Sequence, residues 1–287
     1  MNRKILKNCP ISCFADEISE HMDEQIALLE ELGISWIEFR SGDGKSVADY
    51  TLEEAANLKA KLEEHHIGIS AIGSPIGKIN ITDDFEEHQK LLAHIADLAD
   101  ILGTRFVRVF SFYVREEKNA VEYRDEVIRR LRAMKEFAAE RNLVLLHENE
   151  KGIYGDNAER CLELMQELGD EHFKCTFDFA NFVQIKQETI FAFEQLKEYV
   201  SYVHIKDALW EDGTVVPGGE GDGCLADILE KLDEMGYAGF LSLEPHLTDF
   251  AGLQSLEKGG AASRGRTDQK NAFRQAYQAL QKLLGTE

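Results

Sequence analysis

Short hydrophobic runs alternate with longer amphipathic segments along the whole chain of 287 residues. The runs are rich in β-branched and aromatic residues, as strands are, and the segments between them repeat apolar positions with the helical period. Most of these helical segments end in Gly or Asn just before the next run, which is typical of a helix C-terminus. The predicted strands are residues 11–15, 36–40, 68–73, 106–112, 143–149, 174–180, 201–207 and 240–246.

Eight strand-then-helix units without a break favour a closed parallel barrel over an open sheet. The chain length suits an α/β fold of the (β/α)8 TIM barrel type, since such barrels have about 250 residues plus insertions. No Pro-rich or low-complexity linker divides the chain, so we predict a single domain over residues 1–287. Residues 251–268 form the loosest stretch, and we predict a mobile loop there before the C-terminal helix.

Composition disfavours several classes of partner. The chain has 53 acidic against 32 basic residues and a formal net charge of -21. Such a surface repels phosphate backbones and anionic lipids, so we expect no nucleic-acid and no membrane partner. No apolar stretch approaches the ~20 residues of a membrane helix, and the first residues lack the pattern of a signal peptide. The five cysteines form no C-x-x-C motif, which favours reduced thiols and a cytoplasmic location.

Polar side chains collect at the ends of the last four predicted strands, where barrel enzymes carry their active sites. Side chains alternate between the two faces of a strand. By this rule, each of the four strands presents one residue that could bind a metal ion, at a comparable height near its tip. These residues are Glu148, Asp178, His204 and Glu244. One such residue alone is usually a solvated strand end. Four on consecutive strands indicate a site for one divalent ion, Mn²⁺, Zn²⁺, Co²⁺ or Mg²⁺.

Two features near these tips could bind a substrate anion. Lys206 shares a strand face with His204, and it either binds a substrate oxyanion or phosphate or pairs with a carboxylate at the rim. The loop PGGEGDG, residues 217–223, offers backbone N–H groups but lacks the Lys and Ser/Thr of a P-loop. A plain turn is therefore the stronger interpretation of this loop. Glu220 within it either closes over the substrate or braces a neighbouring loop.

Charged residues also interrupt the second and fourth predicted strands. Glu38 and Arg108 lie among apolar neighbours, and interior layers of a barrel draw on alternate strands. A buried charge needs a partner, so we predict that these two residues form a structural ion pair, with substrate contact as the alternative. Arg40 lies two residues beyond Glu38, nearer the mouth, and is the better candidate for substrate binding.

Over nearly its whole length, the chain resembles the sugar phosphate isomerase/epimerase, or xylose isomerase-like, family of TIM barrels. The motifs that carry the resemblance are HENE, FDFAN, VHIKD, GEGDG and GFLSLEP in the second half, and FADEIS, GSPIGK and RVFSFY in the first. The resemblance implies that Glu148, Asp178, His204 and Glu244 hold one divalent metal ion. It also implies that Glu148 and Glu244 are the catalytic acid/base pair, as in the ketose 3-epimerase branch.

The sequence departs from the family pattern at two positions. Glu150 and Asn181 stand where many relatives carry histidines, and those positions usually contact substrate. We therefore expect the departure to change the substrate more than the metal. The predicted substrate-binding residues are Arg40, Glu150, Asn181, Lys206, Glu220 and His246.

The predicted function is a divalent-metal-dependent isomerase or epimerase of a small sugar, sugar phosphate or polyol derivative. It would abstract a proton next to a carbonyl and form a metal-stabilised enediolate. The same ligands could serve a lyase or dehydratase, resembling inosose dehydratase or enzymes that cleave oxidised glycosides. An endonuclease IV-like DNA-repair enzyme is disfavoured by the net charge and by Asn181, and a non-catalytic sugar-binding barrel is the last alternative. The helical exterior offers surfaces for a homo-oligomer.

Overall fold

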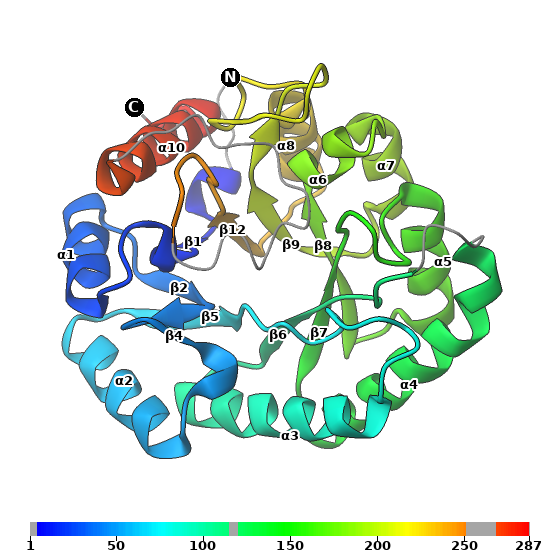
Figure 1. Ribbon diagram of the computed structural model, residues 1–287. Coiled ribbons are helices and arrows are strands. Elements are labelled where there is room, and N and C mark those ends of the chain that lie inside the picture. Colours follow the sequence, from blue (N-terminus) through cyan, green and yellow to red (C-terminus); the bar gives the residue numbers. More distant parts are fainter. Residues whose placement is uncertain (1–4, 115–119, 251–267, 287) are drawn as a thin grey trace.

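The computed structural model describes residues 5–114, 120–250 and 268–286, and its main strands form one parallel sheet. These strands are β1 (Ile11–Cys13), β2 (Trp36–Phe39), β5 (Gly68–Ile72), β6 (Phe106–Val109), β7 (Val144–Glu148), β8 (Phe173–Asp178), β9 (Val200–Ile205) and β12 (Phe240–Leu243). They pair in the order β1-β12-β9-β8-β7-β6-β5-β2, and the two end strands contact each other. The sheet is a nearly closed barrel ringed by helices (Figure 1), which confirms the predicted (β/α)8 TIM barrel.

Helices cover the outside of the barrel (Figure 1). They are α1 (Met22–Leu32), α2 (Leu52–Glu64), α3 (Phe85–Leu102), α4 (Arg124–Glu140), α5 (Ala158–Leu168), α6 (Phe179–Gln184), α7 (Thr189–Leu196), α8 (Leu225–Glu234) and α10 (Gln269–Leu284). Helices α1 and α3 end at Gly33 and Gly103, whose φ angles of 69° and 78° are the left-handed conformation that closes a last turn. Among the helices of the described chain, none combines the length and apolar character needed to cross a bilayer.

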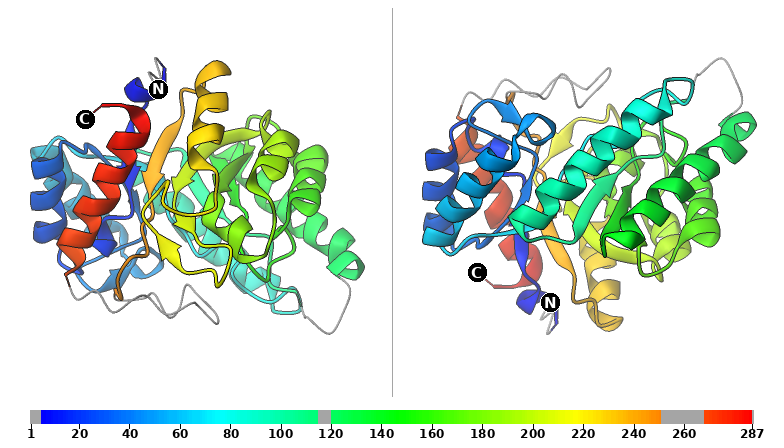
Figure 2. Two further views of the ribbon diagram at one scale, coloured as in Figure 1. Left: turned by 90° about the horizontal axis from the view of Figure 1, so that it is seen from above. Right: turned by 90° about the horizontal axis from the view of Figure 1, so that it is seen from below.

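Short elements fill the connections. They are the 3-10 helices η1 (Leu6–Asn8), η2 (Ala15–Glu17), η3 (Val47–Asp49) and η4 (Ala120–Tyr123), and the antiparallel pairs β3 (Ser41–Gly42) with β4 (Lys45–Ser46) and β10 (Asp207–Ala208) with β11 (Val215–Val216). Figure 2 shows η1 and the last turn of α10 at the end of the barrel where the strands begin. The strand tips lie at the opposite end. Of the predicted loop 251–268, residues 251–267 lie outside the described residues.

Side chains of the strands alternate between the barrel interior and the layer beneath the helices. On β8, Phe177 points outward and packs against Phe182 and Phe193 of α6 and α7, at ring-centroid distances of 5.2 and 5.7 Å. On β7 and β9, Leu146 and Tyr202 belong to a buried cluster inside the barrel. The residues two positions further along β7 and β9 therefore point inward at the strand tips.

His147, next to these inward residues, points outward from β7 and is fully buried. Its ring stacks on Phe173 at a centroid distance of 6.1 Å, and neither ring nitrogen makes a hydrogen bond. Burial disfavours the charged imidazolium and lowers the pKa of His147 from 6.5 to about 4. The folded protein therefore holds this ring in its neutral form.

This burial predicts a specific loss of stability in mild acid. As the pH falls below the ordinary histidine pKa, the unfolded chain binds a proton at His147 that the folded chain does not bind. We expect proton binding at His147 to lower the unfolding free energy by about 2 kcal/mol as the pH falls from about 7 to about 5. His147→Phe fills the same apolar surroundings without titrating, so its urea unfolding free energy should depend less steeply on pH. Equal pH dependence in the two proteins would contradict this account.

Candidate metal centre

The four predicted ligand residues come together at the tips of four neighbouring strands. Glu148 and Asp178 end β7 and β8, His204 lies near the end of β9, and Glu244 directly follows β12. One carboxylate oxygen from each acid and one imidazole nitrogen all lie within 4.8 Å of one another. All four side chains are buried. The barrel thus gathers residues that are nearly one hundred positions apart into one compact cluster.

His204 sits at the centre of this cluster. Its Nδ1 lies 3.1 Å from Glu148 Oε1, 3.4 Å from Glu244 Oε2 and 3.8 Å from Asp178 Oδ2. Its Nε2 faces the other way, 3.1 Å from Glu38 Oε2. One ring nitrogen therefore faces the three acids at the strand tips, and the other faces a fourth acid deeper in the barrel.

The cluster has the properties of a cation site. Glu148 Oε2 and Asp178 Oδ2 are buried and accept no hydrogen bond, and their polar contacts are ion pairs with Arg108 and Lys206. Burial, with the charges of Glu148 and Glu244, raises the pKa of Asp178 to about 7, as expected where like charges crowd together. Three carboxylates and one imidazole are ligands that divalent ions accept readily. The residues present therefore fit one divalent cation.

Two basic side chains border the cluster. Arg108 Nη1 lies 3.2 Å from Glu148 Oε2 and 3.6 Å from Glu244 Oε1. Lys206 Nζ lies 3.0 Å from Asp178 Oδ2 and 3.1 Å from Glu244 Oε2. Each base bridges two of the three acids, which offsets part of their mutual repulsion.

The predicted ion pair between Glu38 and Arg108 is wrong. Arg108 reaches the strand tips, where two carboxylates are available to it, and Glu38 instead contacts His204 and Ser242. Both residues are buried and both charges have partners, as the sequence predicted. The partners differ from the prediction, because Arg108 pairs with Glu148 and Glu38 contacts His204.

Arg40, predicted to bind substrate, does not line the pocket described below. It is 7% exposed, and its guanidinium bonds Asp16 at 2.8 Å, Glu17 at 3.3 Å and Glu244 Oε1 at 3.0 Å. Asp16 and Glu17 belong to η2, the 3-10 helix that follows β1. The structure therefore makes Arg40 a support for Glu244, because three carboxylates occupy the donors that a substrate would need.

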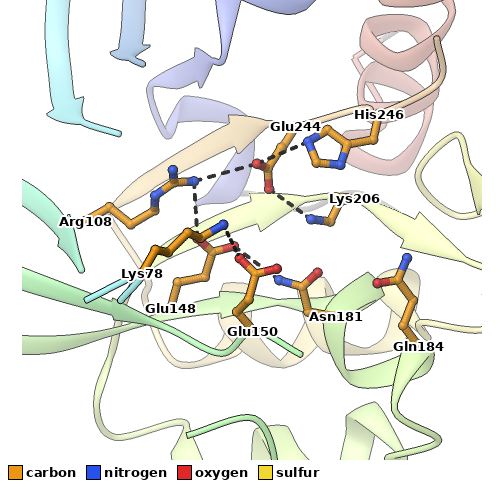
Figure 3. A pocket seen from close by; sticks show the side chains of 9 residues that line it. All are labelled: Lys78, Arg108, Glu148, Glu150, Asn181, Gln184, Lys206, Glu244 and His246. Carbon is orange, nitrogen blue, oxygen red and sulfur yellow. Dashed lines mark hydrogen bonds and ion pairs between the residues drawn. The ribbon is translucent and has the colours of Figure 1, made fainter. Parts of the chain in front are cut away.

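A polar pocket opens beside the cluster, and its lining side chains converge on a common space (Figure 3). The lining residues are Lys78, Arg108, Glu148, Glu150, Asn181, Gln184, Lys206, Glu244 and His246. Four of the six predicted substrate-binding residues are among them. Lys78 and Gln184 were not predicted, because one lies in the long loop after β5 and the other at the end of α6. Two sequence signals were available: both segments follow the C-terminal end of a barrel strand, and Lys78 ends the motif GSPIGK.

Local hydrogen bonds hold several lining residues in place. Asp178 caps the first turn of α6 by accepting the backbone N–H of Asn181 at 2.7 Å, so β8 ends before the predicted residue 180. The Asn181 side chain then donates to Glu148 Oε1 at 3.2 Å. On the other side of the pocket, Lys78 Nζ lies 2.6 Å from Glu150 Oε2. His246 has a φ of 45°, uncommon for a large side chain, and its backbone N–H donates to Glu17.

The loop of residues 217–223 is held by a side chain of the protein itself. The buried carboxylate of Asp207 accepts the backbone N–H groups of Gly219, Gly221 and Gly223 at 2.9, 3.0 and 2.9 Å. These donors are therefore not available to a phosphate, and the structure supports the turn interpretation. Glu220 is exposed and is not among the lining residues of the pocket, so the structure does not bring it to the site.

Comparison with known protein families gives one match that covers most of the chain. A family model described as xylose isomerase-like TIM barrel matches residues 26–283. Among curated proteins, a 3-dehydroshikimate dehydratase of Bacillus anthracis is 25% identical over 129 residues, which are 45% of this chain and 46% of that protein. An uncharacterized protein of Methanocaldococcus jannaschii is 30% identical over 98 residues, 33% of each. The chain thus spans less than half the length of these curated relatives.

Solved structures share the fold over nearly the whole chain. An L-ribulose 3-epimerase superposes with a TM-score of 0.75 at 20% identity, covering 97% of this chain and 95% of that one. An IolI protein with a bound zinc atom gives 0.74 at 16% identity, with 96% and 98% covered. The probable 3-dehydroshikimate dehydratase AsbF of Bacillus anthracis gives 0.72 at 18% identity, with 94% and 98% covered. At these identities the likeness is one of fold.

Proposed function

Since the chain belongs to the xylose isomerase-like TIM barrel family, we propose that it is a divalent-metal-dependent isomerase or epimerase of a small sugar or polyol derivative. The observation that carries this proposal is the convergence of Glu148, Asp178, His204 and Glu244 on one buried point beside a polar pocket. The fold shared with an epimerase and with a zinc-bound protein supports it. The proposed cofactor is one ion of Mn, Zn, Co or Mg.

A divalent ion at these four residues would supply Lewis-acid polarisation of a carbonyl and a template for the adjacent hydroxyl. The chain adds positive charge around the same space through Arg108 and Lys206, which lie beside the ligand carboxylates. Negative charge that develops on a substrate oxygen is stabilised by fixed donors of this kind in a buried site. Both groups are in position before substrate arrives.

Glu148 and Glu244 are the proposed acid/base pair. In the protein without an ion, burial raises the pKa of Glu148, but the positive charges of His204 and Arg108 outweigh burial and lower this pKa to about 2. Burial likewise raises the pKa of Glu244, and Lys206 and His246 bring it well below its usual range. Both carboxylates are therefore ionised at neutral pH, as a proton acceptor must be. Proton removal by one and return by the other gives epimerisation, and return to the neighbouring carbon gives isomerisation.

A dehydratase is the second candidate, favoured by a specific observation. One curated relative is named a 3-dehydroshikimate dehydratase and one solved structure a probable one. Dehydration begins with the same step, removal of a proton next to a carbonyl, and then expels a β-hydroxyl as water. The proposed base and cation site serve both reactions, so the reaction depends on which substrate the pocket accepts.

Proton NMR in D₂O separates the two candidates. The protein would be loaded with Mn²⁺, Mg²⁺, Zn²⁺ or Co²⁺ and incubated with ketoses, inososes and 3-dehydroshikimate, then quenched and stripped of metal before the spectra are recorded. Exchange of a C–H proton without loss of water supports the isomerase or epimerase, and a new unsaturated product supports the dehydratase. Glu140→Gln, which changes an exposed acid at the end of α4 outside the pocket lining, is the control variant. Neither exchange nor conversion of any compound with any ion would contradict both candidates.

A further inference from the structure

Glu38 is a carboxylate buried beneath the proposed metal centre and only 1% exposed. It comes from β2, yet its partners lie on β9 and β12. Its Oε2 lies 3.1 Å from His204 Nε2 and accepts a hydrogen bond from Ser242 Oγ at 2.8 Å. An acid inside a barrel is costly unless it is hydrogen-bonded, and these two contacts satisfy it.

His204 binds an ion in its neutral form, and the contact with Glu38 then favours the proton on the nitrogen that faces away from the ion. A neutral imidazole has one N–H donor and one lone pair, and a carboxylate only accepts. With the proton on Nε2, the ring donates to Glu38 and leaves the Nδ1 lone pair facing Glu148, Asp178 and Glu244. With the proton on Nδ1, the Nε2 lone pair would face the Glu38 carboxylate and be repelled by it. Glu38 therefore favours the form of His204 that can bind an ion at the strand tips.

The aromatic residues around His204 fix the plane of its ring. Phe14 and Tyr202 pack edge-on against it, with ring centroids at 5.3 and 5.8 Å and interplanar angles of 79° and 88°. The imidazole is itself fully buried. These two rings and the buried surroundings restrict rotation of the imidazole, so the position of its proton decides which nitrogen can bind an ion.

We propose that Glu38 is a positioning residue of the metal centre, which accepts the Nε2 proton of His204 and thereby directs Nδ1 to the ion and tightens its binding. This inference rests on the proposed function, since it requires an ion at the four strand-tip residues. Outer carboxylates of this kind typically change metal affinity by about 10- to 100-fold. A pair that served only the fold would stabilise the protein equally with and without an ion.

Glu38→Gln tests this role because it keeps the shape of the side chain and removes its charge. The measurements are the Kd for Mn²⁺ by isothermal titration calorimetry and the urea unfolding free energy in EDTA. We expect Glu38→Gln to raise the Kd by about 10- to 100-fold. Ser242→Ala is the matched control, because it removes the other partner of Glu38 and leaves the carboxylate on His204. It should raise the Kd much less.

The outcomes separate this inference from the proposed function. If Glu38→Gln binds Mn²⁺ as tightly as Ser242→Ala does, and only its unfolding free energy falls, Glu38 serves the fold alone and the inference is overturned. If the unaltered protein binds none of the four metals at these residues, the proposed function itself fails. Should Glu38→Gln not fold, Glu38→Asp applies the same test, since it keeps the charge but draws it back from the ring. An unchanged Kd in Glu38→Asp would then overturn the inference.

Discussion

Glu244→Gln is expected to lower kcat by about a thousandfold or more, because a positioned general base typically contributes about 10²- to 10⁴-fold and Glu244 is also a proposed metal ligand. The amide keeps the size of the side chain and can still accept from Arg40, which lies 3.0 Å from Oε1. It loses the negative charge that a proton acceptor needs. The measurement is the rate of C–H exchange or turnover with the substrate that the NMR screen identifies.

The fold should survive this change. Arg40 keeps its bonds to Asp16 and Glu17, and Lys206 keeps its contact with Asp178, so neither base is left without an acid. Far-UV circular dichroism and urea unfolding check this point. Glu140→Gln makes the same chemical change at an exposed position at the end of α4 and should retain full turnover. Normal turnover in Glu244→Gln would remove this residue from the mechanism.

His204→Ala is expected to weaken divalent-metal binding by more than about 100-fold. Removing a residue that only hydrogen-bonds to a metal ligand typically lowers metal affinity by about 10- to 100-fold. His204→Ala removes a proposed ligand itself, so the loss should be larger. Metal analysis after gel filtration measures the ion retained per protein chain. His66→Ala removes an exposed histidine outside the cluster and should retain the ion as the unaltered protein does. An unchanged metal-to-protein ratio in His204→Ala would break the proposed ligand set.

The four strand-tip residues could be predicted from the sequence because the rules that place them are local. Each side chain lies on the inward face of its own strand. Which face a residue takes follows from the alternation of apolar and polar neighbours along that strand alone. The barrel then brings parallel strand tips to one end, so Asp178 and His204 had to lie close together once the fold was correct. The predicted strand ran to residue 180, whereas β8 ends at Asp178, because the Asp178 side chain caps α6. Asp178 nevertheless lies at the strand tip, as predicted.

Contacts across the barrel could not be predicted in this way. Which interior residues meet depends on the tilt and stagger of the strands, and these are properties of the closed sheet. The sequence analysis therefore recognised Glu38 and Arg108 as buried charges in need of a partner but paired them wrongly, and it did not predict the contact of Arg40 with Glu244. Lys78 was missed for a related reason. Its loop bonds to the segment after β6, where the Phe110 N–H donates to the Ile76 carbonyl at 2.8 Å, and no local pattern states where a long loop returns.

The central claim is that residues 148, 178, 204 and 244 share one ion, and anomalous diffraction from crystals grown with Mn²⁺ or Zn²⁺ tests it most directly. We predict a single strong anomalous peak about 2.0 to 2.4 Å from His204 Nδ1 and from one oxygen each of Glu148, Asp178 and Glu244. A peak that contacts other residues, or no peak among these four side chains at saturating ion, would contradict the account.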